Sequence, residues 1–558
     1  MAEISYKKIG EILIEQGFIS MEQLREALEE QKLTGEKVGE ILVKKGVVGQ
    51  EEIELALSKQ KGIARFDLSN YIIEPSLFKL IPEDFARKYK LLPVFLIENT
   101  LTVAMADPTN VFIIDELQRL TKLMVEPVLA QELEIKKSQD QYYGGSGTLL
   151  EIVASIDRSK LSEGEKLGEE APIIKIVNYL IMQAVQLKAS DIHIEPEEKT
   201  LNIRYRVDGL LRRQSPLPKD LSGAVISRFK IMSGLDISEK RLPQDGRIIM
   251  KIGNKDIDFR VSTCPTIHGE NVVLRILDKS GVVLGLETLG FPAKELGMFQ
   301  EMIHSPYGII LVTGPTGSGK TTTLYSALQI LNKETVNIMT VEDPVEYQFP
   351  GIRQVPVNVK TGLTFAAALR SFLRQDPNII MLGEIRDHET AEIAIQAALT
   401  GHLVLSTLHT NDSSSAFSRL IDMGIEPFLV SSSILGVMAQ RLIRRVCERC
   451  KESYAPSEEA LRNIGLADKI GQNITFNKGI GCKLCNSSGY KGRLGIYEIL
   501  KVSPKVQETV LKRSSADDIR AIAIKEGLST LRDAALQKLL AGLTTPEEVM
   551  RVTLEASE

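Results

Sequence analysis

The stretch GPTGSGKTT at residues 314–322 constrains the fold of this chain more than any other feature of the sequence. It follows the apolar run Ile309–Val312, so the sequence predicts a strand, a glycine-rich turn and then a helix. In that context the glycines let successive backbone N–H groups point at phosphate oxygens, and the positive end of the helix adds to the attraction. The stretch therefore predicts a nucleotide-binding loop made of Gly314, Pro315, Thr316, Gly317, Ser318, Gly319, Lys320, Thr321 and Thr322.

Two members of this loop receive specific roles from its pattern, GxxxxGK[ST]. Lys320 is expected to reach the β- and γ-phosphates, and Thr321 is expected to place its hydroxyl on Mg²⁺. The alternative is a glycine-rich turn that happens to carry a lysine. That alternative explains neither the strand before the loop nor the helix formers after it, so the sequence favours binding of a nucleotide with magnesium.

The composition sets outer limits on the kind of protein this is. With 558 residues the chain is too long for one hydrophobic core, so about three or four domains are expected. A net charge of -5 gives no general basic field, which disfavours nucleic acid as a partner. No run approaches the roughly 18 apolar residues of a membrane span, and the amino terminus resembles no secretory signal. We therefore expect a cytoplasmic protein that reaches a membrane only through partners.

Residues 8–31 and 37–60 repeat one pattern. The first copy reads KIGEILIEQGFISMEQLREALEEQ and the second reads KVGEILVKKGVVGQEEIELALSKQ, with Gly, Leu, Ala-Leu and Gln at matching offsets. The repeat predicts two copies of one helix-turn-helix unit, and Ser20 is placed to cap the second helix of the first copy. The repeated Leu and Ile positions suit a small helical core, which by itself does not require the repeated glycines.

The repeat resembles the tandem motif of the cyclic-di-GMP-binding N-terminal domain found in some secretion and pilus ATPases. That resemblance implies cyclic-di-GMP as a candidate ligand, and a purely structural or docking role is the alternative. Lysine stands where the family's motif opens with arginine, and lysine cannot stack as a planar guanidinium on guanine, so weaker binding is expected. The candidate residues are Lys8, Gly10, Leu13, Gly17, Lys37, Gly39, Leu42 and Gly46.

Short apolar strands and helical segments alternate over residues 63–143, so an N-terminal domain is predicted over residues 1–143. Residues 144–170 lack a sustained apolar period and predict a mobile linker. A second domain is predicted over residues 171–285, opening with an amphipathic helix and continuing in strands of period two. Its charged residues predict ion pairs across neighbouring strands rather than a metal site, and they are Asp191, His193, Glu195, Arg204 and Arg206.

Arg260 and Arg275 each stand within an otherwise apolar strand of this second domain. Either arginine could be a structural ion-pair partner. Both are also candidates for contact with a triphosphate, because a guanidinium binds phosphate oxygens with two parallel hydrogen bonds.

After the glycine-rich loop, three apolar strands end in polar residues. The first ends at Glu342, the second in Gly383-Glu384, and the third leads to His409. Carboxylates at the carboxyl end of a strand can hold Mg²⁺ through water or orient an attacking water. Gly383 stands where an aspartate for Mg²⁺ is common, so Glu342 or Asp343 is expected to compensate. His409 is a candidate sensor of a γ-phosphate, with a structural histidine as the alternative.

Together these motifs resemble the type II secretion and type IV pilus assembly ATPases, most closely the pilus extension ATPases. The resemblance covers nearly the whole chain and rests on the loop, on VEDPVEY at 341–347, on LRQDPNIIMLGEIRD at 373–387 and on the span 401–409. It implies a multidomain α/β fold, with a RecA-like P-loop ATPase core in residues 286–558 behind a PAS-like domain in residues 171–285. It also implies a homohexamer that hydrolyses MgATP to drive an inner-membrane platform protein, with cytoplasmic accessory proteins.

The same resemblance implies roles for four residues. Arg260 and Arg275 would meet the triphosphate, while Glu384 and Glu342 would serve the magnesium and the water. A type II secretion ATPase shares every motif and is the nearest alternative. A retraction motor is disfavoured because such chains generally lack the long N-terminal domain and the cysteine module. A cyclic-di-GMP receptor with incidental ATP turnover is the alternative from a different class.

Two CxxC pairs follow the core, Cys447 with Cys450 and Cys482 with Cys485. Four thiolates suit a tetrahedral Zn²⁺, and a cytosolic setting argues against disulfides. A redox CxxC would leave the second pair unexplained, so a zinc module is predicted over residues 444–495. Cys264 is expected to be an inert packed residue. Residues 500–558 are expected to be helical, with Thr545 capping the final helix.

Overall fold

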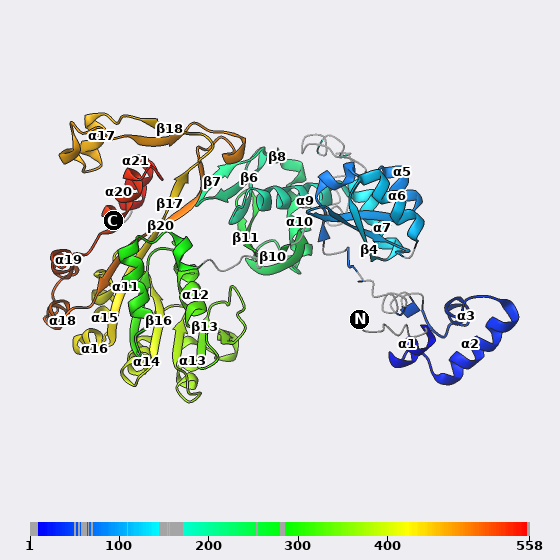
Figure 1. Cartoon of the computed structure of the whole chain (residues 1–558), viewed down its shortest axis with the longest axis horizontal. Coiled ribbons are helices and arrows are strands. Elements are labelled where there is room, and N and C mark those ends of the chain that lie inside the picture. The colour runs from blue at the N-terminus through cyan, green and yellow to red at the C-terminus, as the bar shows by residue number, and fades with distance from the viewer. Residues whose placement is uncertain are drawn as a thin grey trace. The chain divides into compact units, whose positions relative to one another are not determined.

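The structure is a computed structural model that forms two compact units, Met1–Ser280 and Gly281–Glu558 (Figure 1). The predicted linker lies outside the described residues except for Val153 and Ile156, and Lys8 lies outside them too. The residues that the structure describes are 9–49, 52–53, 56, 64, 66–68, 71–108, 110–143, 153, 156, 171–252, 255–278 and 285–554.

The repeat at the start of the chain folds as helices α1 (Ile9–Glu15), α2 (Met21–Thr34) and α3 (Val38–Lys44). The predicted cap of α2 is confirmed, because the Ser20 hydroxyl accepts from the backbone N–H of Gln23 at 3.2 Å. Matching apolar positions of the two copies pack in one small core, in which Leu13 and Leu42 are fully buried.

The repeated glycines have a structural role in the helical fold. The expectation that a small helical core would not need them is therefore wrong. A Cβ on Gly10 would lie 2.5 Å from the Leu24 side chain, and a Cβ on Gly39 would lie 3.2 Å from Ile53. Gly17 and Gly46 adopt φ of +74° and +67°, the left-handed region that favours glycine. Close helix packing and tight turns therefore account for both glycine pairs.

A small α/β layer follows the repeat. Its strands β2 (Leu91–Ile97), β3 (Thr100–Met105) and β4 (Met124–Leu129) form one sheet in that order, with β3 antiparallel to β2 and parallel to β4. The apolar core of this layer also receives residues of the surrounding helices. These helices are α5 (Glu83–Lys88), α6 (Val111–Thr121) and α7 (Glu132–Tyr142).

The rest of the first unit is a larger sheet with the strand order β1-β9-β10-β11-β5-β6-β7, and β8 pairs with β6. Helices α9 (Ala171–Gln186) and α10 (Ser222–Met232) share one apolar core with this sheet, and the Tyr205 hydroxyl donates to the Leu180 carbonyl oxygen at 2.9 Å. The strands are β1 (Tyr71–Ile72), β5 (Asp191–Pro196), β6 (Thr200–Val207), β7 (Leu210–Arg213), β8 (Leu217–Pro218), β9 (Gln244–Ile252), β10 (Lys255–Thr266) and β11 (Gly269–Asp278).

Cys264 on β10 is exposed, so the expectation of a packed cysteine is wrong. Its neighbour Thr263 is fully buried, and side chains alternate between the two faces of a strand, which turns the thiol of Cys264 outward.

The second unit is built on a seven-stranded sheet with the order β14-β13-β15-β16-β12-β17-β20, in which only β20 runs antiparallel to its neighbour. All six residues of β12 are buried, as expected for a strand covered on both faces. The strands are β12 (Gly308–Thr313), β13 (Ile338–Glu342), β14 (Ile352–Pro356), β15 (Ile379–Leu382), β16 (Leu403–Leu408), β17 (Ile434–Val446) and β20 (Tyr490–Lys501).

Helices pack on both faces of this sheet. Ile310 and Val312 of β12 join a core with α11 (Ala293–Ile303) and α12 (Lys320–Leu331), while Ile309 and Leu311 join a second core on the other face. The helices of that second face are α13 (Phe365–Phe372), α14 (His388–Leu399), α15 (Ser415–Asp422), α16 (Pro427–Ser433), α18 (Pro504–Leu511) and α19 (Ala516–Lys525).

A cysteine-bearing module extends from the ends of the long strands β17 and β20. Its predicted first residue, 444, lies inside β17, which ends at Val446. Its further elements are β18 (Lys451–Tyr454), α17 (Glu458–Asn463) and β19 (Phe476–Gly479). Helices α20 (Leu531–Leu540) and α21 (Pro546–Leu554) pack against it, and Thr545 caps α21 by accepting from the N–H of Glu548 at 3.4 Å. Among the helices described, none combines the length and the apolar character that a bilayer crossing requires.

Candidate nucleotide-binding site

The glycine-rich loop joins β12 to α12 at the carboxyl edge of the parallel strands, as the sequence predicts. Gly314 has φ +146°, and a Cβ there would lie 2.5 Å from the carbonyl oxygen of Gln440 on β17. Only glycine therefore lets the loop pass this close to the neighbouring strand. The Ser318 hydroxyl is buried and has no hydrogen-bond partner among the described residues, which is an orphaned donor suited to an anion.

Lys320 begins α12 and bends back over the loop. Its ammonium donates to the carbonyl oxygens of Gly314 at 2.6 Å and of Pro315 at 3.1 Å. Burial, opposed by the charge of Glu384, lowers the pKa of Lys320 to about 8. Thr321 follows in the first turn of α12 with an exposed side chain. These contacts hold the ammonium at the loop, where it could bind a phosphate.

The structure brings Glu384 and His409 together beside this lysine. The Glu384 carboxylate, at the end of β15, lies 2.6 Å from the Arg386 guanidinium and 3.4 Å from His409 Nε2. Its Oε2 is buried and makes no hydrogen bond within the described part of the chain. Burial first, and then the charge of Lys320, lower the pKa of His409. The nearest described partner of this oxygen is His409 Nε2 at 3.4 Å, so the carboxylate keeps acceptor capacity that suits a hydrated cation.

Glu342 ends β13, which pairs with β15, so it lies at the same carboxyl edge of the sheet as Glu384. Its side chain is buried, with 3% of its surface exposed. Its carboxylate accepts hydrogen bonds from Thr340 at 2.6 Å, from Gln354 at 3.1 Å and from the Tyr325 hydroxyl. The expected site residue is therefore held in a buried network rather than in open solvent.

Sequence reasoning missed Arg441 on β17. This side chain is 5% exposed and donates to the carbonyl oxygens of Asn411 at 2.8 Å and of Gln440 at 3.1 Å. Its charge helps to lower the pKa of Lys320, so two cations flank the phosphate loop. An arginine inside the apolar run VMAQRLI carries the same signal that singled out Arg260 and Arg275.

Arg260 and Arg275 lie in the first unit, directly opposite each other on β10 and β11. Arg275 is 57% exposed in its side chain and lies 3.2 Å from the buried carboxylate of Asp191. The predicted cross-strand ion pairs are confirmed, with Arg204 at 2.6 Å from Glu195 and Arg206 at 3.3 Å from Asp191. These arginines thus belong to a charged face of the sheet.

The four predicted cysteines gather into one cluster in which all Sγ atoms lie within 4.8 Å of one another. Three of the Sγ–Sγ distances are 3.7–3.8 Å. A Zn–S bond of about 2.3 Å in a tetrahedron places two sulfurs about 3.8 Å apart, whereas a disulfide needs about 2 Å. The cluster formed by Cys447, Cys450, Cys482 and Cys485 therefore fits a closed zinc site.

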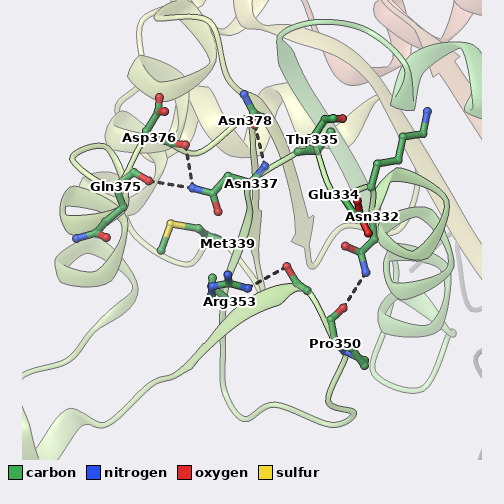
Figure 2. Close-up of a pocket in the computed structure, with 13 residues that line it drawn as sticks. Asn332, Glu334, Thr335, Asn337, Met339, Pro350, Arg353, Gln375, Asp376 and Asn378 are labelled. Atoms are coloured by element: carbon green, nitrogen blue, oxygen red, sulfur yellow. Dashed lines mark hydrogen bonds between the residues drawn. The ribbon is translucent and has the colours of Figure 1, made fainter.

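A separate cavity of about 1060 Å³ lies at the opposite edge of this sheet, next to the residues that precede β13 and β15. Figure 2 shows its lining, where Asn337 donates to the carbonyl oxygens of Gln375 and Asp376 and Asn332 donates to that of Pro350. Several of its polar side chains thus bind the protein itself, and the cavity lies away from the phosphate loop.

Residues 166–551 match the family of type II/IV secretion system proteins. The chain belongs to this family. Residues 62–149 match a second family, the MshEN domain. Both matches confirm the family and the multidomain α/β fold class that the motifs predict.

Relatives of this secretion family cover almost the whole chain. The type IV pilus assembly ATPase PilB of Myxococcus xanthus is 48% identical over 556 residues, 97% of this chain and 98% of the relative. The type II secretion system protein E of Xanthomonas campestris is 46% identical over 479 residues, 85% of this chain and 84% of the relative. The structure of the Legionella pneumophila ATPase DotB shares the fold at TM-score 0.51 and 21% identity, over 67% of this chain and 94% of that one.

Proposed function

We propose that this chain hydrolyses MgATP and uses the energy to power assembly of a type IV pilus. The observation that carries the hydrolysis is the meeting of three groups at the glycine-rich loop. They are the Lys320 ammonium, the buried Ser318 hydroxyl, which has no partner among the described residues, and the Glu384 carboxylate, whose Oε2 lies 3.4 Å from His409 Nε2. A triphosphate with its magnesium supplies partners for all three groups. The near full-length identity with a pilus assembly ATPase supports the choice of filament.

The reaction would be phosphoryl transfer to water, in which the water oxygen bonds to the γ-phosphorus as the bond to ADP breaks. Lys320 and the backbone N–H groups of the loop hold the phosphates, and Thr321 and Glu384 would hold magnesium, which neutralises phosphate charge when bound. Glu342 would orient the water and take its proton, and neutral His409 would donate to the γ-phosphate. Most of the catalysis comes from positioning.

A homohexamer would turn this reaction into motion. Arg260 and Arg275 belong to a different compact unit from the phosphate loop, so their contact with a triphosphate would couple the nucleotide state to the relative position of two units. We place the protein in the cytoplasm, where it would act on an inner-membrane platform protein with its cytoplasmic accessory proteins. The domain boundaries expected from the sequence stand as part of this proposal.

Three variants test the hydrolysis by a steady-state ATPase assay with magnesium. Lys320→Ala should lower turnover on the order of 10²-fold or more, because the cation on the β- and γ-phosphates is lost. Glu384→Gln should keep ATP binding and lose hydrolysis. Arg513→Ala, which removes a surface ion pair with Glu426, should match the parent. A Glu384→Gln variant that turns ATP over at the parent rate contradicts the assigned role.

A type II secretion ATPase remains the second candidate, because relatives of that kind match the chain about as well. Co-purification from cells followed by identification of the inner-membrane partner separates the two. A pilus platform protein supports pilus assembly, and a secretion-system platform protein supports the second candidate.

We also propose cyclic-di-GMP as a regulatory ligand of the N-terminal repeat, supported by the match of the adjoining layer to the MshEN domain. Calorimetry of the full chain with cyclic-di-GMP should give binding heat, and Lys37→Arg should strengthen it, because a guanidinium stacks on guanine. No heat at high micromolar ligand contradicts this role and leaves the repeat a structural or docking element.

A further inference from the structure

The Glu342 carboxylate is held by donors from three different elements. Its Oε1 accepts from Thr340 of β13 and from Gln354 of β14, and its Oε2 accepts from Tyr325 of α12. A carboxylate offers about four acceptor positions, so one position on Oε2 stays open among the described residues. The side chain therefore has one orientation and one unused acceptor position on Oε2.

Tyr325 is the donor that reaches Glu342 from the helix of the phosphate loop. Its hydroxyl also accepts from the backbone N–H of Glu346 at 3.2 Å, so it is fixed as donor to the carboxylate. The ring is 1% exposed and meets Tyr347 and Phe349 edge-on, at centroid distances of 6.0 and 5.0 Å. The packed ring leaves the hydroxyl no room to turn away.

We propose that Tyr325 is a positioning residue that holds the Glu342 carboxylate in register with the phosphate loop. This inference rests on the proposed ATP hydrolysis. Helix α12 starts at Lys320, so one rigid helix carries both the cation for the phosphates and the hydroxyl that aims the carboxylate. Catalysis by positioning is sensitive to shifts of about 1 Å, so the tie between helix and carboxylate fixes where the water attacks.

The test compares Tyr325→Phe with Tyr497→Phe in the full chain. Tyr497 is also a fully buried tyrosine of the second unit, and its hydroxyl donates to the Leu289 carbonyl oxygen at 2.9 Å, away from Glu342. Tyr325→Phe should lower kcat by about tenfold to a hundredfold, the range for losing one hydrogen bond to a charged group, with KM for ATP within about twofold. Tyr497→Phe should keep kcat within about twofold even where its melting temperature falls.

A double-mutant cycle separates positioning from a general structural effect. In a Glu342→Gln background, adding Tyr325→Phe should change kcat by less than about twofold, because the group that Tyr325 acts through is already lost. Equal losses in both backgrounds, or parent-like kcat in Tyr325→Phe, would overturn the inference and leave the proposed hydrolysis intact. A parent protein without ATP turnover would overturn the proposed hydrolysis, and with it this inference.

Discussion

At the scale of single residues, Gly314 lies between two cations. The ammonium of Lys320 binds its carbonyl oxygen at 2.6 Å, and a Cβ added at this glycine would lie 2.9 Å from the Arg441 guanidinium. Two positive charges this close repel each other, which contributes to the lowered pKa of Lys320. The loop is therefore suited to an anion with several negative charges.

Arg441→Ala should lower ATP turnover by about tenfold or more, because it removes one of the two cations and the hydrogen bonds that tie Asn411 to β17. Arg441→Lys should restore little, because an ammonium lacks the fork that reaches both Asn411 and Gln440. Turnover and nucleotide affinity of both variants check this. Parent-like turnover in Arg441→Ala would remove the residue from the site.

At the scale of elements, the cysteine module brings two turns together at its four thiols. Cys447 and Cys450 come from one turn and Cys482 and Cys485 from the other, and their thiols meet in a small buried cluster. The binding energy of a structural metal is folding energy, so the module should need its zinc.

The full chain should hold about one Zn²⁺, as expected for a closed four-cysteine site. Cys482→Ser should lose the metal and raise hydrogen exchange in residues 444–495, whereas Cys264→Ser should keep it, because that exposed thiol lies outside the cluster. Metal analysis of protein prepared without chelator checks both. A chain free of zinc in that preparation contradicts the assignment.

Helix α21 is held to β17 by the carboxylate of Glu548, which is 1% exposed. Burial alone would raise the pKa of Glu548, but hydrogen bonds from Arg551 and Arg444 outweigh it and lower the pKa to about 2 from 4.5. Because the folded value is depressed, the stabilisation is fully present above about pH 4.5 and is lost as the pH falls toward 2.

Glu548→Gln should therefore reduce the stability of α21 on the order of 2 kcal/mol at pH 7, and the difference from the parent should shrink toward zero at pH 2. Hydrogen exchange of residues 546–554 at both pH values measures it. Glu547→Gln at the exposed neighbouring position is the matched control. A difference from the parent that stays constant with pH would rule out this ion pair as its cause.

Many of the individual strands, helices and loops could be predicted from the sequence, because they depend on local patterns. The buried strand 379–382 and the loop at 314–322 follow from apolar runs and glycine spacing. Contacts such as Tyr325 with Glu342, or Gly314 with β17, depend on pairings between segments far apart in the chain, which no local pattern reveals. The prediction that Cys264 is packed was wrong for a related reason. Residue type alone does not tell which face of a strand is covered by the rest of the protein.

At the scale of the whole molecule, the proposed motor depends on contact between the triphosphate and the arginines of the first unit. Arg260→Ala and Arg275→Ala should each lower turnover on the order of 10³-fold, as for other arginines that stabilise phosphoryl transfer, and should weaken ATP binding less. Arg204→Ala is the control, because that arginine is already bound to Glu195 by two hydrogen bonds of 2.7 and 2.6 Å. Parent-like turnover in both variants would leave these arginines as ion-pair partners only.

The long strand β17 passes the phosphate loop at Gln440, beside Gly314, and ends just before Cys447. Near its start it pairs with β12, and at its end the ladder with β20 is irregular between Arg444 and Val446, just before Cys447. A paired ladder resists bending, whereas an irregularity turns the strand. The irregularity thus lies where the chain leaves the sheet and enters the turn that carries Cys447 and Cys450. Lengthening or shortening the chain by one residue there would change how these two thiols meet Cys482 and Cys485.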